Sequence, residues 1–353
     1  MKVAIIYNEP KHTEADDHWL TRSRGESALE EGFRDGSEFG VLDEMKLIAG
    51  ELEAAGYAVI LFSVNDDVRR LIAFLNDEKP DVIFNLCESV MGKSSLEMCV
   101  AGIYELYDIP YTGASAVGLG NALNKWIAKS LFVAHKIPTP KFLHLSEGEE
   151  LPHRLNMHYP LIVKPASEDA SIGIDNNSIV KTRKELKARV EFVHREFKQA
   201  ALVEEYIDGR ELNVALLASA SGELEALPIS EITFDTMPAG NPRIVSYEAK
   251  WVEDSPLYHT TIPVCPAKID KQTAQRAREI ALQAASVVGL RDYGRVDMRM
   301  RESDNALFVL EANPNPDISH DAGFMRAART SGRTHEETIV EILAQAARRK
   351  TSL

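Results

Sequence analysis

Two segments near the C-terminus alternate polar and apolar residues and carry acidic side chains among the polar ones. Residues 293–299 read YGRVDMR, and residues 305–313 read NALFVLEAN. Alternation over this length predicts half-buried strands. Residues 302–305, between them, are typical of a turn, so the two strands are predicted to form an antiparallel hairpin with its turn centred near Asp304.

The register of this hairpin predicts a cluster of polar groups on one face. It sets Asp297 opposite Glu311 and Arg295 opposite Asn313. Two carboxylates and an amide are hard oxygen ligands, which suit Mg²⁺ with bound phosphate completing its octahedron. Directly opposed acids would repel each other without a cation between them. The competing interpretation is that Arg295 and Arg299 neutralise the acids on an exposed face.

A second segment ends in Gly-Lys-Ser and invites comparison with a phosphate-binding P-loop. Residues 87–94 read CESVMGKS and lie between a predicted strand and a predicted helix. A P-loop has glycine where Cys87 stands, because its backbone must curl around phosphate. We therefore interpret the segment as the start of a helix that is capped by Ser94 or Ser95.

The first third of the chain alternates strand-like and helix-like segments, which predicts an open α/β domain. The segments expected there are 2–7, 42–55, 57–62, 81–86 and 96–107. A polar stretch at 9–40 is too long for a routine strand-to-helix connection, and a lid, an oligomer contact or disorder would each explain it. The remaining two thirds mix strands, loops and helices. The longest helices expected there are 183–197 and 271–288.

With the hairpin in view, the order of short motifs resembles the D-alanine–D-alanine ligase branch of the ATP-grasp superfamily. The resemblance runs from Asp81 to the C-terminus, about three quarters of the chain. Each motif is weak alone, but several in the expected order are specific. They are IPYTG (109–113) followed by NALNK (121–125), LIVKP (161–165) with SIG (171–173), ALVEEYI (201–207), YEAK (247–250), GRVD (294–297) and LEANP (310–314).

The resemblance implies a fold of α/β and α+β class: an ATP-grasp fold preceded by an N-terminal open α/β domain. The expected boundaries are 1–120 for that domain, 121–207 for a central ATP-grasp subdomain and 208–353 for a C-terminal subdomain with the metal hairpin. ATP would bind between the last two. The implied reaction joins a carboxylic acid to an amine through an acyl-phosphate and releases ADP and phosphate.

The resemblance also implies roles for residues that bind the phosphates of ATP. Lys125 and Lys164 would contact the phosphates as point charges. Ser171 and the backbone of Gly173 would cover them, and Lys250 would reach the γ-phosphate when its loop closes. Plain surface lysines are the competing interpretation for Lys125 and Lys250.

Further roles follow for the nucleoside, the metal and the transition state. Glu204 would accept a hydrogen bond from the adenine amino group, Ile207 belongs to the adenine hinge, and Glu211 would accept from the ribose hydroxyls. Arg295 would stabilise the tetrahedral intermediate. The metal, Mg²⁺ or Mn²⁺, would be held by the hairpin residues Asp297, Glu311 and Asn313.

The departures from the family pattern fall on the amino-acid subsites. Ala170 stands where the ligases carry a serine, and Trp251 where they carry a tyrosine. The N-terminal Gly-Gly-x-Ser-x-Glu pattern is missing, with Glu38 as the candidate substitute. Asp317 and Asp321 replace a glycine and a serine that help to receive the acceptor's carboxylate. The nucleotide chemistry therefore transfers from the family, and the substrates do not.

Composition excludes some partners. A formal net charge of −14 over 353 residues argues against a nucleic-acid surface. The three cysteines lack zinc-site spacing, and no segment approaches the roughly 20 apolar residues of a membrane span. We expect a cytoplasmic homodimer that acts on a small-molecule acid and a small-molecule amine.

Two other functions stay open. The chain could be a true D-alanine–D-alanine ligase with an unusual substrate shell, or a nucleotide-binding protein that has lost ligase chemistry. The intact set of Arg295, Asp297, Glu311 and Asn313 speaks against the second, because binding alone would not need the arginine.

Overall fold

The computed structural model describes residues 1–8, 36–64, 67–91, 93–168, 171–252 and 254–349, with only the backbone described for 36–41. The chain divides into two compact units, one formed by Met1–Thr112 with Ile339–Leu353 and the other by Gly113–Thr338. The domain boundaries expected at residues 120 and 207 stay predictions.

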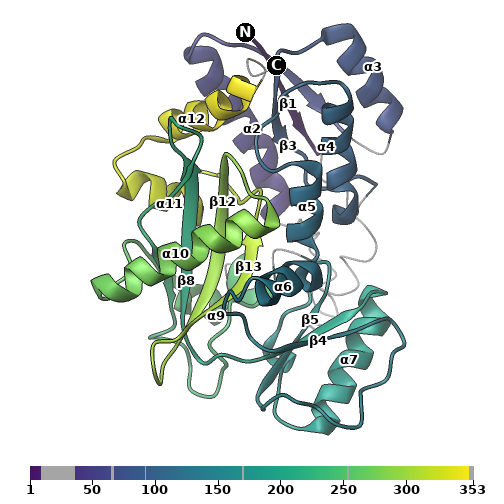
Figure 1. Cartoon of the computed structure of the whole chain (residues 1–353), viewed down its shortest axis with the longest axis vertical. Helices are drawn as coiled ribbons and strands as arrows, with labels where there is room; N and C mark the ends of the chain where they lie inside the picture. The colour runs from purple at the N-terminus through teal and green to yellow at the C-terminus, as the bar shows by residue number, and fades with distance from the viewer. Residues whose placement is uncertain (9–35, 65–66, 92, 169–170, 253, 350–353) are drawn as a thin grey trace. The chain divides into compact units, whose positions relative to one another are not determined.

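The first unit contains a parallel sheet with the strand order β2-β1-β3 (Figure 1). Its core is made by buried apolar strand residues such as Ile5 and Phe84. The helix after β1 begins at Gly36, earlier than the expected residue 42. The elements are β1 (Lys2–Tyr7), α2 (Gly36–Ala54), β2 (Ala58–Ser63), α3 (Val68–Glu78), β3 (Val82–Leu86), η2 (Ser94–Leu96), α4 (Glu97–Leu106) and most of α12 (His335–Arg348).

In the segment with the Gly-Lys-Ser sequence, several described backbone amides have partners within this unit. The backbone amides of Val90 and Lys93 each donate to the other's carbonyl, at 3.2 and 3.0 Å. The amides of Glu88 and Ser89 donate to Asn8 Oδ1 at 2.7 and 2.9 Å. These amides are therefore occupied and do not form a phosphate cradle. The expected serine cap is wrong, because Lys93 and Leu96 hold the N-cap positions of η2 and α4 and neither provides a side-chain cap.

The second unit contains two antiparallel sheets. The larger has the order β11-β10-β8-β12-β13 with β9 paired to β8, and the smaller has the order β4-β7-β5-β6. The strands are β4 (Phe142–Leu145), β5 (Leu161–Pro165), β6 (Ile179–Val180), β7 (Ala201–Glu205), β8 (Gly209–Ala218), β9 (Leu224–Ala226), β10 (Ser230–Thr233), β11 (Ile262–Val264), β12 (Tyr293–Arg301) and β13 (Leu307–Asn313).

Short and long helices accompany these sheets. The two long helices that were expected, at 183–197 and 271–288, are confirmed with the same bounds. The helical elements are α5 (Ala116–Leu123), α6 (Lys125–Ala134), η3 (Asn176–Ser178), α7 (Arg183–Phe197), α8 (Tyr247–Trp251), α9 (Pro256–Thr260), α10 (Lys271–Val288) and α11 (Gly323–Thr330).

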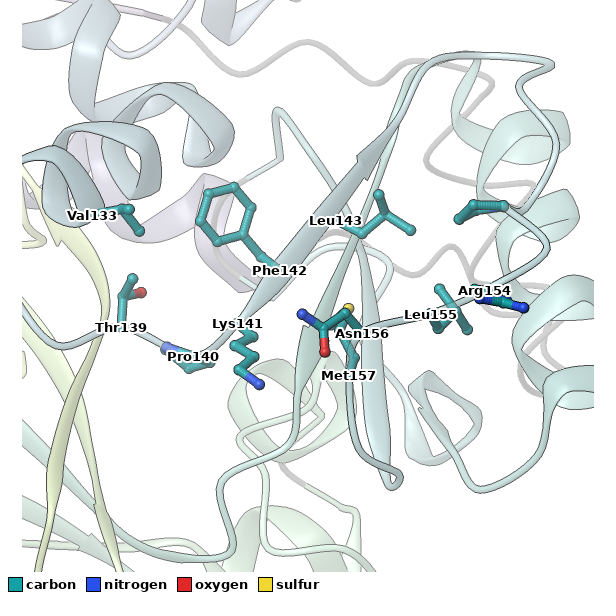
Figure 2. A pocket seen from close by; sticks show the side chains of 11 residues that line it. Val133, Thr139, Pro140, Lys141, Phe142, Leu143, Arg154, Leu155, Asn156 and Met157 are labelled. Carbon is teal, nitrogen blue, oxygen red and sulfur yellow. The ribbon is translucent and has the colours of Figure 1, made fainter.

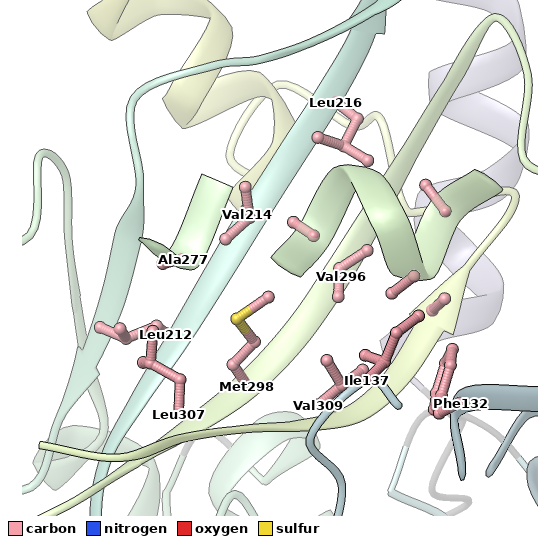
Figure 3. Close-up of a cluster of buried hydrophobic side chains, with 14 of the residues drawn as sticks. Phe132, Ile137, Leu212, Val214, Leu216, Ala277, Val296, Met298, Leu307 and Val309 are labelled. Carbon is pink, nitrogen blue, oxygen red and sulfur yellow. The ribbon is translucent and has the colours of Figure 1, made fainter. Parts of the chain in front are cut away.

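One face of the larger sheet is apolar and is covered by α10 (Figures 1 and 3). Alternate side chains of β8 and β12, including Leu212, Val214, Val296 and Met298, are buried in this core. Because side chains alternate along a strand, the residues between them lie on the opposite face. The odd-numbered polar residues of β8 and β12 therefore lie on that opposite face.

A β-bulge decides which face the acidic end of β13 presents. Met298 pairs with Val309, whereas Asp297 pairs with Glu311, so Leu310 is the extra residue. Leu307 and Val309 lie in the core with Met298. Without the bulge, strict alternation would place Glu311 on that same core face. The bulge puts it on the opposite face, across from Asp297.

The smaller sheet has the same division into an apolar and a polar face. Alternate residues of β5 and β7, including Val163 and Val203, pack with the apolar side of α7. The residues between them include Lys164 and Glu204, which consequently lie on the other face.

Candidate active site

Asp297 is surrounded by nitrogen donors. Its Oδ1 accepts hydrogen bonds from Asn213 Nδ2 and from Arg295 Nε, both at 2.7 Å. Its Oδ2 accepts from Arg295 Nη2 at 2.8 Å and from Asn313 Nδ2 at 2.9 Å. Burial acts to lower the pKa of Arg295, but Asp297 outweighs that effect and raises it. The guanidinium and the carboxylate therefore form a fixed bidentate pair.

Glu311 is balanced by a different cation. Lys125 Nζ lies 3.4 Å from Glu311 Oε2 and donates to the Glu168 carbonyl at 2.6 Å. Burial acts to raise the pKa of Glu311, but Lys125, Lys164 and Arg295 outweigh it and hold the pKa at about 2. The carboxylate is therefore ionised at neutral pH. The predicted pairing of Asp297 with Glu311, and of Arg295 with Asn313, is confirmed.

These oxygen-bearing side chains have the chemistry that a hard divalent cation requires. Asp297 and Glu311 provide carboxylates and Asn313 an amide oxygen. Among the described residues, no group of three or more His, Cys, Asp and Glu side chains could hold a metal ion. A cation here would thus take part of its ligands from a bound molecule such as a phosphate. The residues fit Mg²⁺ provided that the cation takes the place of Arg295 on Asp297.

Glu204 lies between two lysines on the polar face of the smaller sheet. Lys129 Nζ forms an ion pair with Oε1, and Lys164 Nζ lies 2.8 Å from Oε2. Burial acts to raise the pKa of Glu204, but Lys129 and Lys164 outweigh it and lower that pKa. The carboxylate is fully buried. It can therefore remain charged only because cations surround it.

Arg299 connects the strand of the hairpin to the segment that follows β7. Its Nε donates to the Ile207 carbonyl at 3.0 Å, and its Nη1 donates to Glu211 Oε2 at 3.0 Å. Its Nη2 donates to the Arg243 carbonyl at 2.7 Å. Burial raises the pKa of Glu211 although Arg299 opposes it. Arg299 thus does not neutralise acids on an exposed face, because it is buried and positions Glu211 and the Ile207 backbone.

Two loops are joined next to these residues. Ser171 Oγ donates to the Val245 carbonyl at 2.9 Å, and the Tyr247 amide donates to the Ile174 carbonyl at 2.9 Å. Gly173 has a positive φ of 74°, and a Cβ there would lie 2.8 Å from Phe197 Cζ. Glycine is required at this position by its backbone conformation and by close packing.

Lys250 lies in the second of these joined segments. The expected mobile loop is partly helical, because α8 begins at Tyr247 and Ser246 caps it through the Ala249 amide. Burial and the nearby Arg295 lower the pKa of Lys250, while Asp317 acts in the opposite direction. Lys250 is therefore close to the hairpin cluster, and its ammonium lies 4.7 Å from the ring centre of Trp251.

Known proteins resemble this chain over most of its length. A family model described as D-ala D-ala ligase C-terminus matches residues 131–344. The D-alanine–D-alanine ligase of Janthinobacterium sp. (strain Marseille) is 32% identical over 286 residues, which cover 80% of this chain and 83% of that protein. The chain belongs to the D-alanine–D-alanine ligase family. As a member of this family it is an ATP-dependent ligase by class.

This ligase also resembles a second relative and a solved structure. An uncharacterized protein y4sG of Sinorhizobium fredii (strain NBRC 101917 / NGR234) is 35% identical over 268 residues, covering 76% of this chain and 75% of that protein. The crystal structure of the D-alanine–D-alanine ligase from Bacillus anthracis complexed with ATP has a TM-score of 0.72 at 19% identity, covering 99% of this chain and 98% of that one. The likeness confirms the expected ATP-grasp fold.

Of the four residues at which this ligase departs from the family pattern, three lie in the described part of the chain. Trp251 is half-buried beside Lys250. Asp317 is exposed, with Oδ1 accepting from the Ser319 amide at 2.8 Å. The side chain of Asp321 is 96% exposed and directed to solvent. Ala170 lies outside the described residues.

Sequence reasoning missed three residues of the candidate site, Asn213, Lys129 and Arg299. Lys129 lies four residues after Lys125, on the same face of α6, so helical spacing was the signal for it. Arg299 lies two residues after Asp297 on the same face of β12, where only the competing interpretation, an exposed face with neutralised acids, included it. Local sequence does not indicate that Lys129 pairs with Glu204 or that Arg299 pairs with Glu211.

A cavity of about 390 Å³ lies along the edge strand β4 (Figure 2). Figure 2 shows Val133, Thr139 and Phe142 on one side of it and Asn156 and Met157 on the other. None of the predicted site residues lines this cavity.

In the described part of the chain, no helix is long and apolar enough to span a membrane.

Proposed function

We propose that this ligase joins a carboxylic acid to an amine through an acyl-phosphate, using ATP and releasing ADP and phosphate. The observation that carries the proposal is the cluster on one face of the hairpin. Asp297 and Glu311 are direct partners there, with Arg295 on Asp297 and Lys125 on Glu311. Such an arrangement of acids and cations is suited to phosphoryl transfer, where charge neutralisation and positioning do most of the work.

In this proposal the nucleotide lies between the polar faces of the two sheets. Glu204 accepts from the adenine amino group, and the Ile207 backbone and Glu211 receive the rest of the nucleoside. Arg299 supports this placement, since it holds both the Ile207 carbonyl and the Glu211 carboxylate. Lys125 and Lys164, both buried, would bind the phosphates.

The metal in the proposal is Mg²⁺ or Mn²⁺, held by Asp297, Glu311 and Asn313. When bound, it would supply positive charge to the phosphate oxygens. Arg295 would leave Asp297 and stabilise the oxyanion that forms when the amine attacks the acyl carbon. Ser171 and Lys250, whose segments are joined by hydrogen bonds, would close over the phosphates and exclude water.

The substrates in this proposal differ from two D-alanines. Trp251 lies beside Lys250, the charge of Asp317 acts on Lys250 and Arg295, and both stand where the family pattern has other residues. The experiment that tests the function is a phosphate-release screen with ATP, Mg²⁺ and mixtures of amino acids, other acids and amines. An acid–amine pair that releases phosphate and yields an amide is the expected result. Nucleotide binding without phosphate release by any pair would favour a protein that has lost ligase chemistry.

The phosphate-binding lysines yield a separate prediction. Lys164→Met or Lys125→Met is expected to weaken ATP binding by about 1–3 kcal/mol, because each removes one charge-assisted hydrogen bond. Lys93→Met is the matched control, since Lys93 is exposed and its backbone pairs with that of Val90. Calorimetric titration with ATP measures all three. A larger loss of ATP affinity for Lys93→Met than for the other two variants would support the P-loop interpretation.

A further inference from the structure

Lys129 is held in place from two sides. Its ammonium forms an ion pair with Glu204 and donates to Thr139 Oγ1 at 2.8 Å. Thr139 in turn donates to the Val309 carbonyl at 2.8 Å. The lysine side chain is 1% exposed. This chain of contacts ties α6 to β13 and fixes the ammonium against one oxygen of Glu204.

Lys164, the second cation on Glu204, is placed differently. It is the next-to-last residue of β5, directly before the loop that carries Ser171 and Gly173. In the proposed function Lys164 binds the phosphates of ATP, so nucleotide binding draws its ammonium away from Glu204. Lys129 is then the cation that stays on Glu204. The neighbouring acid Glu205 lies on the opposite face of β7, where it accepts a hydrogen bond from the His158 amide.

We propose that Lys129 determines nucleotide specificity by keeping Glu204 ionised and oriented toward the base when Lys164 moves to the phosphates. The inference rests on the proposed function, in which Glu204 faces the 6-amino group of adenine. An ionised carboxylate only accepts hydrogen bonds and therefore matches an amino donor. A protonated Glu204 would offer a competing donor. Lys129 is thus a positioning residue, acting on the base through Glu204.

Without Lys129, the cation that remains on the buried Glu204 carboxylate is Lys164, and the proposed function places Lys164 on the phosphates of ATP. Burial without a counter-ion favours the neutral acid, which raises the pKa of the carboxyl. Below that raised pKa the acid is protonated and the preference for a 6-amino group is lost. Above it the carboxylate is ionised and the preference returns. Burial lowers the pKa of Lys129, and the neighbouring Glu204 opposes this effect. The wild-type protein should keep its preference throughout, because the ion pair keeps Lys129 charged beside Glu204.

The experiment compares ATP with purine riboside triphosphate, which lacks the 6-amino group and keeps the remaining ring. Dissociation constants are measured for the full chain between pH 6 and pH 9. Wild type is expected to favour ATP by about 10–100-fold at every pH, the value of one hydrogen bond to a charged group. In Lys129→Met the ratio is expected to fall to within about threefold at pH 6 and to rise again toward pH 9. Lys187→Met, which removes an exposed lysine from α7, should match wild type.

Three further variants separate the effect on specificity from an effect on folding. Thr139→Val removes the hydroxyl that holds Lys129 and should lower the ATP preference, whereas Thr139→Ser should retain it. The double variant Lys129→Met with Glu204→Gln removes both charges of this ion pair, so that no buried carboxylate is left without Lys129, and its ratio should show no pH dependence. If Lys129→Met does not fold, Thr139→Val and the double variant provide the test.

The outcomes distinguish this inference from the proposed function. A wild-type protein that binds neither nucleotide would overturn the proposed function. The proposed role of Lys129 is wrong if wild type prefers ATP and Lys129→Met keeps the same ratio of dissociation constants with the same flat pH profile. Where Lys129→Met is unfolded, the same result for Thr139→Val decides against the role. The expected loss and its recovery at high pH would support it.

Discussion

Asp297→Asn and Glu311→Gln are each expected to abolish ATP-dependent phosphate release while the protein remains folded. Each change removes one of the two carboxylates that face each other across the hairpin. With one acid left, the site loses a hard ligand and half of its negative charge, so it should no longer hold Mg²⁺. We expect a loss of at least about a hundredfold in turnover, the scale seen when one electrostatic contact to the transition state is removed.

The measurement has two parts. Phosphate release is followed with ATP and the acid–amine pair found by screening, and Mn²⁺ binding is followed separately by its paramagnetic signal. Chelator should remove activity from the unaltered protein, and Mg²⁺ or Mn²⁺ should restore it. Glu302→Gln is the control, because this acid lies in the turn of the same hairpin and is exposed. Near-normal rates for Asp297→Asn would show that the hairpin is not the metal site.

The pair of Arg295 with Asp297 adds a condition to this prediction. Arg295 occupies both oxygens of the carboxylate that a metal would need. A metal must therefore compete with a bidentate guanidinium, and Arg295→Met should bind Mn²⁺ more tightly than the unaltered protein. The same variant should lose turnover, since it lacks the cation proposed for the oxyanion. A gain in metal affinity together with a loss of turnover would show that Asp297 binds the metal and that Arg295 acts in catalysis.

The hairpin shows how far local sequence can predict a site. The alternation of residues 293–299 and 305–313 predicted two strands, and the expected partners of Asp297 and Arg295 are the observed ones. The alternation did not predict the bulge at Leu310, although the bulge is what places Glu311 opposite Asp297. Near the turn the register differs by one residue from the expected one. The pairing was therefore predicted correctly without the physical reason for it.

Contacts between distant segments were beyond the reach of sequence patterns. Lys129 and Glu204 are far apart in the chain, and nothing in α6 indicates which acid its lysine meets. The same holds for Arg299 and the Ile207 carbonyl. Helical and strand periodicity indicates which face a side chain occupies, and the packing of two sheets decides what lies across from it. The missed residues are the ones whose role depends on that packing.

D-alanine alone is expected to be a poor substrate. In the ligases that this chain resembles, neutral groups receive the carboxylate of the acceptor, and here Asp317 stands at such a position. Asp317 is close enough to Lys250 and Arg295 to act on both: it opposes the burial and the Arg295 charge that lower the pKa of Lys250, and it supports the raised pKa of Arg295. Two carboxylates about 4 Å apart repel by about 1 kcal/mol in water and by about 4 kcal/mol at an effective dielectric constant of 20. Because Asp317 is exposed, its effect should lie toward the lower value.

The second acid that was expected to act in this way, Asp321, offers a matched control. Its side chain is directed to solvent, where water screens its charge. Phosphate release with saturating D-alanine, ATP and Mg²⁺ should be slow in the unaltered protein and in Asp321→Asn. Asp317→Asn should raise kcat/KM for D-alanine, measured below saturation, about fivefold or more, the factor that corresponds to about 1 kcal/mol of binding free energy. Turnover of about 1 per second or faster by the unaltered protein, as in ordinary enzymes, would instead identify a true D-alanine–D-alanine ligase that tolerates an acid beside its acceptor.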